Sequence, residues 1–152
     1  MCAIALAAGA SVARADGHNI FISNCAVCHQ PDGKGAPSVY PPLAGSVGKY
    51  VALKEGRAYV IDVVSFGMGG KIDSAGDSFE GDMPPWPQLN DQDVADVLNY
   101  VLTSLNAKLL PTDFKPISPE EVKAERAKTL TAAAVHTERD ALIKQLGDKA
   151  AK

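Results

Sequence analysis

One long segment of the chain has its hydrophobic residues spaced as in an amphipathic helix. Asn90 is followed by Asp91 and Asp93, which is typical of a helix start with an N-cap and acids in its first turn. The apolar positions that follow recur at intervals of three and four residues: Val94, Val97, Leu98, Val101, Leu102 and Leu105. Such spacing indicates one buried face. We therefore predict a helix that begins after Asn90 and runs to Leu105.

A shorter helix is predicted near the start of the chain, over residues 17–24. Gly17 and Phe21 stand eight and four positions before Cys25, so the three residues share one helical face. Glycine has no side chain to keep a neighbour away. We therefore expect another backbone segment to pass close to Gly17.

The middle of the chain has weaker patterns. Residues 47–55 and 58–66 both carry apolar residues at helical spacing, and we predict a helix in each. Residues 71–81 are polar and contain glycine, which indicates an irregular loop. Together with the helices above, these segments predict an all-α fold.

The C-terminal part of the chain has its own organisation. Three prolines within residues 109–119 favour extended backbone, so residues 107–118 are predicted to form a linker. Ser118-Pro119-Glu120-Glu121 is a capping box with proline at the first helical position. It predicts a helical tail over residues 119–152, with one uninterrupted helix to about residue 146.

The apolar face of this tail is thin, because much of it is alanine, which buries little area. Three arrangements remain open at this point. The tail can be a docking arm for another subunit, a helix laid back over the chain's own domain, or a frayed extension in solvent.

The N-terminus resembles a targeting segment. Residues 2–12 are small and apolar, about as long as the hydrophobic part of a secretory signal and too short to span a bilayer. Ala13-Arg14-Ala15 then gives an A-x-A cleavage pattern. We predict that residues 1–15 are a signal peptide and that the mature protein starts at Asp16. No positively charged segment precedes the apolar run, which leaves open where the signal begins, and the alternative is an alanine-rich helix kept in the fold.

The charge of the chain is unevenly distributed. Residues 16–114 hold 6 basic and 12 acidic side chains, a net of −6, whereas residues 115–152 hold 8 basic and 6 acidic ones, a net of +2. Hydrophobic residues make up 46% of the chain, which is enough for a core. We therefore expect a folded domain with an acidic surface, and no nucleic acid as its partner.

The sequence Cys25-Ala26-Val27-Cys28-His29 carries the chemistry of this chain. Two thiols three positions apart and an adjacent imidazole suit covalent haem attachment, because each sulfur can form a thioether to a haem vinyl group while the histidine reaches the iron. A zinc site would need a second clustered pair of ligands, and the remaining candidates, Cys2, His18 and His136, do not form one. A redox dithiol would need a βαβ context that is absent from the pattern.

A second iron ligand is expected from a methionine. Met1 is removed with the signal peptide, so Met68 and Met83 compete. A thioether is a weak iron ligand and needs a loop that presents it without further ordering. Met68 stands among glycines with nothing to hold its side chain, whereas Pro84 and Pro85 stiffen the backbone directly after Met83. We therefore predict Met83 as the ligand.

Two further prolines lie in Tyr40-Pro41-Pro42-Leu43-Ala44-Gly45. They prevent regular helix and hold the backbone extended. This turn is well positioned to accept a hydrogen bond from His29 Nδ1, and such a bond orients the ring and makes the imidazole a better ligand.

In the order and spacing of these residues the chain resembles a class I c-type cytochrome of the bacterial periplasm. The resemblance covers about residues 17–105 and rests on the haem motif and on these residues around it: Gly17, Phe21, Pro41, Leu43, Met83, Pro84, Pro85 and Tyr100. It implies a small cytochrome c fold around one haem c, attached through Cys25 and Cys28, in a domain of residues 16–106. It also implies that the first and last helices of the domain cross and that the Pro41 carbonyl is the partner of His29.

The same resemblance implies electron transfer in the periplasm with His29 and Met83 as the two axial ligands. Both iron positions are then filled, which leaves no open site for a substrate, so we expect an electron carrier and not an enzyme. His18 and His136 are expected to be surface residues. A lone cytochrome of this type can end near Asn106, and the extra tail is the departure from the family pattern.

The expected partners are other redox proteins, and no transmembrane anchor is expected in the mature chain. One alternative is a haem c subunit of a larger periplasmic oxidoreductase, docked through the tail. Another is a haem enzyme or gas sensor in which Met83 is not bound. The acidic residues before Met83 either attract a basic partner surface or belong to an ordinary solvated loop: Asp73, Asp77, Glu80 and Asp82.

Overall fold

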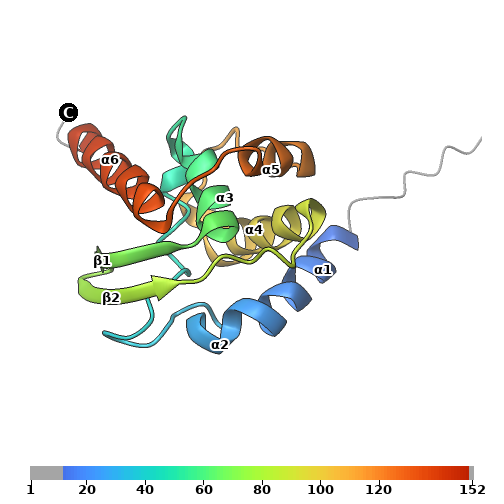
Figure 1. Cartoon of the computed structure of the whole chain (residues 1–152), viewed down its shortest axis with the longest axis horizontal. Helices are drawn as coiled ribbons and strands as arrows, with labels where there is room; N and C mark the ends of the chain where they lie inside the picture. Colours follow the sequence, from blue (N-terminus) through green and yellow to red (C-terminus); the bar gives the residue numbers. More distant parts are fainter. Residues whose placement is uncertain (1–11, 151–152) are drawn as a thin grey trace, which may run out of the picture.

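A computed structural model of the 152-residue chain describes the backbone of residues 12–150 and the side chains of residues 16–147. Most of the predicted signal peptide, residues 1–11, lies outside the described residues. The elements, in chain order, are α1 (Val12–Ile20), α2 (Ala26–His29), α3 (Gly56–Phe66), β1 (Met68–Ser74), β2 (Asp77–Met83), α4 (Asp91–Leu105), α5 (Pro119–Arg126) and α6 (Ala132–Ala150) (Figure 1). No helix in the described range is long and apolar enough to cross a membrane.

Helix α4 forms as predicted. The Asn90 side chain accepts a hydrogen bond from the Asp93 amide, and the Asp93 carboxylate accepts one from the Asn90 amide, so the two ends of the capping box satisfy each other. The predicted apolar face is buried from Val94 to Leu102. Helices α1, α3 and α5 pack against α4.

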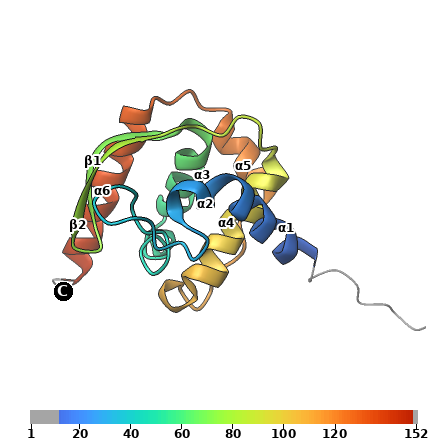
Figure 2. The same ribbon diagram turned by 90° about the horizontal axis from the view of Figure 1, so that it is seen from below.

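The N-terminal helix crosses α4 through the face predicted from the sequence (Figure 2). A π-helical turn, Phe21–Cys25, joins α1 to α2. Phe21 is fully buried against Val97 and Val101, and its ring lies 5.4 Å from that of Tyr100. The crossing fixes the direction in which the chain enters the Cys25–His29 segment.

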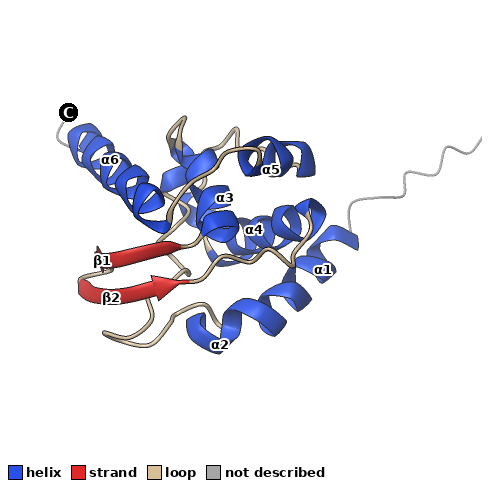
Figure 3. Ribbon diagram, in the orientation of Figure 1, coloured by secondary structure: helices blue, strands red, loops and turns tan. Residues whose placement is uncertain are grey.

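The structure adds to the helices a two-stranded antiparallel hairpin that the all-α prediction did not include (Figure 3). It occupies residues 68–83, where an irregular loop was predicted for residues 71–81. The strands are joined by Ala75-Gly76, both with positive φ, as a tight two-residue hairpin turn requires. Ile72 pairs with Phe79, and both are buried on one face while most other side chains of the strands are polar.

The helix predicted over residues 47–55 is reduced to a single 3-10 turn, Tyr50–Ala52. The Gly48 amide donates to Asn106 Oδ1 at 3.0 Å, and the Asn106 amide group donates to the carbonyls of Leu43 and Val101. These side-chain bonds hold the backbone in a non-helical course. The neighbouring prediction was correct, because residues 58–66 lie within α3.

The tail forms two helices and not one. The capping box at Ser118 is present, and α5 begins at Pro119 as predicted. Residues 127–131 then interrupt the helix, and Thr131 starts α6 by accepting a hydrogen bond from the Ala134 amide. Lys128, inside the interruption, forms an ion pair with Asp62 of α3 at 3.1 Å.

The tail packs on the chain's own domain. Helix α5 lies against α3 and α4, and α6 lies against α3 and beside β1. Four apolar side chains from residues 107–147 are at most 3% exposed: Ile117, Val122, Val135 and Leu142. Of the three arrangements left open by the sequence, the structure shows the tail laid back over the chain's own domain. The apolar face of the tail is therefore buried and not available to a separate subunit.

Candidate haem site

A mostly apolar cavity of about 390 Å³ lies between α2, α3, α4 and the hairpin. Its size falls within the roughly 300–1,000 Å³ typical of cofactor pockets. Cys25, Cys28 and His29 line it, as do the turn at Tyr40–Leu43 and both methionines of the hairpin. The structure thus brings all the predicted site residues to one cavity.

The two cysteines stand at its wall as partly buried free thiols. Burial, with a smaller contribution from the neighbouring Cys28, raises the pKa of the Cys25 thiol to about 11. A redox dithiol or a zinc site needs the thiolate, which electropositive surroundings stabilise by lowering the pKa. The neutral, apolar surroundings of Cys25 suit a sulfur that ends as a thioether.

His29 is held by one backbone hydrogen bond. The residue is 7% exposed, and its Nδ1–H donates to the Pro41 carbonyl at 2.9 Å, which is the bond expected from the sequence. Burial lowers the pKa of His29, and the bond to Pro41 only partly opposes this effect. The ring is therefore neutral near pH 7, and with the proton on Nδ1 its other nitrogen, Nε2, carries a lone pair.

The two methionines are direct partners across the open end of the hairpin, Met68 on β1 and Met83 on β2. Both line the cavity, because residues paired across two strands project from the same face. The sequence had suggested that nothing holds the Met68 side chain, but the structure shows a hydrogen bond to it. The hydroxyl of Tyr59 donates to its sulfur at 3.5 Å.

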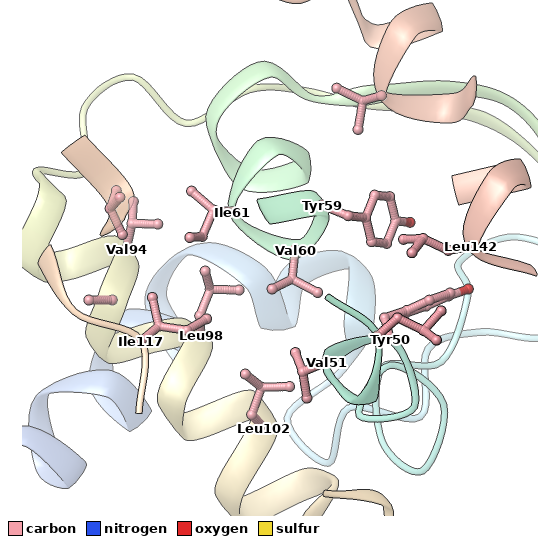
Figure 4. Close-up of a cluster of buried hydrophobic side chains, with 14 of the residues drawn as sticks. Tyr50, Val51, Tyr59, Val60, Ile61, Val94, Leu98, Leu102, Ile117 and Leu142 are labelled. Carbon is pink, nitrogen blue, oxygen red and sulfur yellow. The ribbon is translucent and has the colours of Figure 1, made fainter. Parts of the chain in front are cut away.

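Sequence reasoning missed a polar end of the cavity. Tyr50 and Tyr59 are 4% and 5% exposed, their rings meet edge to face at 5.0 Å, and both extend toward α6, where Leu142 lies beside them (Figure 4). Arg139 of α6 lines the same cavity and is 6% exposed. No periodicity or motif marks these residues, because they come together only when the tail packs.

The two other histidines differ. His18 is exposed and contacts the ring of Tyr100, as expected for a surface residue. The prediction for His136 was wrong. Its ring is half-buried beside Gly70, with Nδ1 at 2.6 Å from the Gly69 carbonyl, and this contact fastens α6 to β1.

Comparison with known proteins agrees with this geometry. The family model described as cytochrome c matches residues 14–104 of the chain. The chain belongs to the cytochrome c family. A cytochrome c-552 of Thermus thermophilus is 41% identical over 142 residues, 93% of this chain and 95% of the relative. A second cytochrome c-552 of the same species is 42% identical over 129 residues, 85% of this chain and 98% of the relative.

The cytochrome is also similar to part of a larger protein. The cytochrome c subunit of a quinone alcohol dehydrogenase from Gluconobacter oxydans is 34% identical over 87 residues, 56% of this chain but 17% of that subunit. The first Thermus alignment leaves only about ten residues of this chain uncovered, so it includes most of the tail. The tail is thus shared with a relative of nearly the same length.

Membership of the family establishes the cofactor and the type of activity. The protein is a c-type cytochrome that carries electrons and is not an enzyme, with haem c attached through Cys25 and Cys28. The apolar cavity and the two cysteine side chains at its wall fit this group. The bound haem supplies a one-electron Fe(III)/Fe(II) couple, and the chain's own residues hold it, exclude water and orient the His29 ring.

Proposed function

We propose that the cytochrome is a periplasmic electron carrier in which His29 and Met83 bind the haem iron from opposite faces. Both axial positions are then filled, so the iron changes oxidation state without binding a substrate. Methionine and histidine together raise the reduction potential relative to other axial sets.

The observation that carries this proposal is the setting of His29. Its Nδ1 is committed to the Pro41 carbonyl at 2.9 Å, so Nε2 is the nitrogen available to iron. The ring belongs to the wall of an apolar cavity that Met83 also lines. A fixed imidazole orientation makes the nitrogen a better ligand and lowers the reorganisation on electron transfer.

The choice of Met83 over Met68 is supported by their hydrogen bonds. Met68 sulfur accepts from Tyr59 at 3.5 Å, whereas no side-chain or backbone donor among the described residues bonds the sulfur of Met83. Pro84 and Pro85 follow Met83 and limit its backbone freedom. A weak thioether ligand benefits from this arrangement, since little further ordering is needed when it binds.

The experiment that tests the ligand pair replaces each methionine in turn. Met83→Ala should abolish the thioether-to-iron charge-transfer absorption of the ferric protein and let carbon monoxide bind the ferrous haem at neutral pH. Met68→Ala, the matched control from the opposite position on the hairpin, should leave both properties nearly unchanged. The reverse pattern would assign Met68, and carbon monoxide binding to the unaltered protein would favour a sensor or enzyme.

The location and the chain division are part of the same proposal. Residues 1–15 act as a signal peptide, the cytochrome domain comprises residues 16–106, and residues 107–152 add the linker and the two helices. Support comes from the A-x-A pattern at Ala13–Ala15 and from covalent haem attachment, which bacteria carry out outside the cytoplasm. N-terminal sequencing of the mature holoprotein should give Asp16 as its first residue.

A second candidate is a subunit of a larger oxidoreductase. It is favoured by the similarity to cytochrome c subunits of quinone alcohol dehydrogenases, although these matches cover only 17–21% of those subunits. Purification of the protein from its own cells, without denaturant, distinguishes the free carrier from the subunit. A subunit would co-purify with another chain in a fixed ratio, and a free carrier would not.

A further inference from the structure

Arg139 is an unusual residue in the tail because its cation is buried. It lies on α6, is 6% exposed, and lines the haem cavity. Its Nη2 donates to the Asp73 carbonyl of β1, which holds the guanidinium at the junction of the hairpin and the cavity. Most arginines on a polar helix extend into solvent, so this orientation needs a physical reason.

No carboxylate supplies that reason within residues 16–147. The ion pairs of this range use Arg57, Arg126, the lysines Lys34 and Lys128, and His136, and none of them involves Arg139. A carbonyl group offsets only part of the desolvation of a cation, and a buried charge is normally paired with an opposite one. The protein therefore presents a cation to the cavity.

The surroundings of Arg139 add to this positive character. Burial and the nearby charge of Arg139 both lower the pKa of Lys49, whose ammonium lies 5.4 Å from the centre of the Tyr50 ring. The guanidinium also lies near the Tyr50 phenol, where it partly opposes the rise in pKa caused by burial. One end of an otherwise apolar cavity thus combines the Arg139 cation with the buried Tyr50 hydroxyl group, and Lys49 lies close by outside the cavity wall.

Haem has the complementary distribution of charge. Its porphyrin ring is apolar apart from two propionate groups, which are carboxylates on one edge. A guanidinium has a planar fork of N–H donors that matches a carboxylate in a bidentate geometry, and the bond is stronger away from water. We propose that Arg139 binds a haem propionate, with the Tyr50 hydroxyl as a second donor, so that the C-terminal tail is part of the cofactor site.

A guanidinium bound to a propionate changes the reduction potential of the haem. A fixed cation near the iron stabilises the ferrous state relative to the ferric one, because reduction lowers the positive charge of the haem. It also keeps the propionate ionised to lower pH. Removing the cation should therefore lower the reduction potential above neutral pH and make the potential rise more as the pH falls.

The test uses the full-length holoprotein with Arg139→Gln. We expect a shift of the propionate bending mode in the resonance Raman spectrum, a lower midpoint potential at pH 8, and a stronger dependence of the potential on pH. The matched control is Lys144→Gln, which removes one positive charge from an exposed position on the same helix and should change none of the three. Unchanged Raman and potential in Arg139→Gln relative to this control would overturn the proposal.

A conservative variant covers the case in which Arg139→Gln does not fold. Arg139→Lys keeps the charge but loses the planar fork, so we expect a potential near that of the unaltered protein together with a shifted propionate mode. An unchanged mode in this variant would also contradict the proposal. The inference rests on a haem in this cavity and not on the identity of the axial methionine. Both Arg139 variants should therefore keep the thioether charge-transfer absorption. This separates a failure of the Arg139 proposal from a failure of the axial-ligand proposal.

Discussion

Gly17 of α1 lies directly against the carbonyl group of Asp96 on α4. A Cβ at this position would overlap that oxygen and would also reach the Tyr100 side chain at 3.0 Å. The helices can therefore cross at this short distance only because the residue has no side chain.

The first prediction follows from this contact. Gly17→Ala should lower the free energy of unfolding by about 1–2 kcal/mol, because an overpacking penalty of roughly 1–3 kcal/mol exceeds the gain of about 1 kcal/mol in helix propensity. Urea denaturation of the holoprotein gives the value. Gly147→Ala is the matched control, since that glycine of α6 has open space around it and its replacement should stabilise the protein slightly. Equal effects at the two sites would contradict the close crossing.

The second prediction concerns the packing of the tail. Leu142 is 2% exposed in the core beneath α6, so Leu142→Ala should destabilise the isolated protein by about 2–4 kcal/mol, as expected for a buried leucine. Leu109→Ala, at a position that is 38% exposed, should change the stability by less than about 0.5 kcal/mol. If thermal unfolding showed no difference between them, the tail would be free in solution and the docking-arm hypothesis would return.

The third prediction is a pH dependence that comes from Asp62. This carboxyl is fully buried in α3, and burial raises its pKa to about 7, against the opposing effect of Lys128. Glu125 and Glu138 also lie near it and add to the rise. The folded protein then keeps a proton that the unfolded chain releases, so stability falls as the pH rises from about 4 to about 7 and levels off above that.

Asp62→Asn removes this dependence. The variant should gain stability relative to the unaltered protein as the pH rises, reaching roughly 2–4 kcal/mol at pH 8, with no gain near pH 4. Denaturation curves at several pH values measure it. Asp113→Asn, which removes an exposed carboxyl in the loop before α5, is the matched control. A flat difference for Asp62→Asn would mean that Lys128 keeps the carboxyl ionised.

The fourth prediction tests the acidic hairpin as a docking surface. Glu80 and Asp82 are exposed and lie at the edge of the haem cavity, whereas Asp77 has a structural role because it accepts hydrogen bonds from Ser38. Oxidation by a cationic cobalt complex should slow as salt rises, since screening shortens to about 8 Å near physiological ionic strength. Glu80→Gln with Asp82→Asn should flatten this dependence.

The control for the hairpin is a double variant with the same net charge as the Glu80→Gln, Asp82→Asn variant. Asp113→Asn with Glu120→Gln removes two acids far along the chain, and the rate should keep most of its salt dependence. Identical behaviour of the two double variants would show that total charge matters and that the hairpin is an ordinary solvated segment.

Local signals predicted the parts of the fold that local chemistry controls. The N-cap at Asn90, the capping box at Ser118 and the apolar spacing of α4 depend on residues a few positions apart, and all three appear in the structure. The hairpin was missed because its strands have few apolar residues. Ile72 and Phe79 are the buried apolar residues of the two strands. The course of the hairpin otherwise depends on the Ala75-Gly76 turn and on helix α6, which packs against β1.

The candidate site divides in the same way. Cys25, Cys28 and His29 are recognisable because they are adjacent, and the Pro41 partner follows from the family pattern. Arg139 could not be predicted from the sequence, since a buried arginine on a polar helix has the same neighbours in sequence as an exposed one. Its position depends on the interruption at residues 127–131, where Lys128 binds Asp62 and α6 takes a new direction.

The cavity wall begins at Asn24 and is completed by Arg139, at nearly opposite ends of the chain. Contacts between such distant positions form slowly, because a long loop must close before they contribute. A haem already linked to Cys25 and Cys28 turns its encounter with the rest of the wall into an intramolecular step with a high effective concentration. In a chain that has not yet received haem, Arg139 lacks the propionate proposed as its partner, so we expect a protease to cut α6 sooner than in the holoprotein.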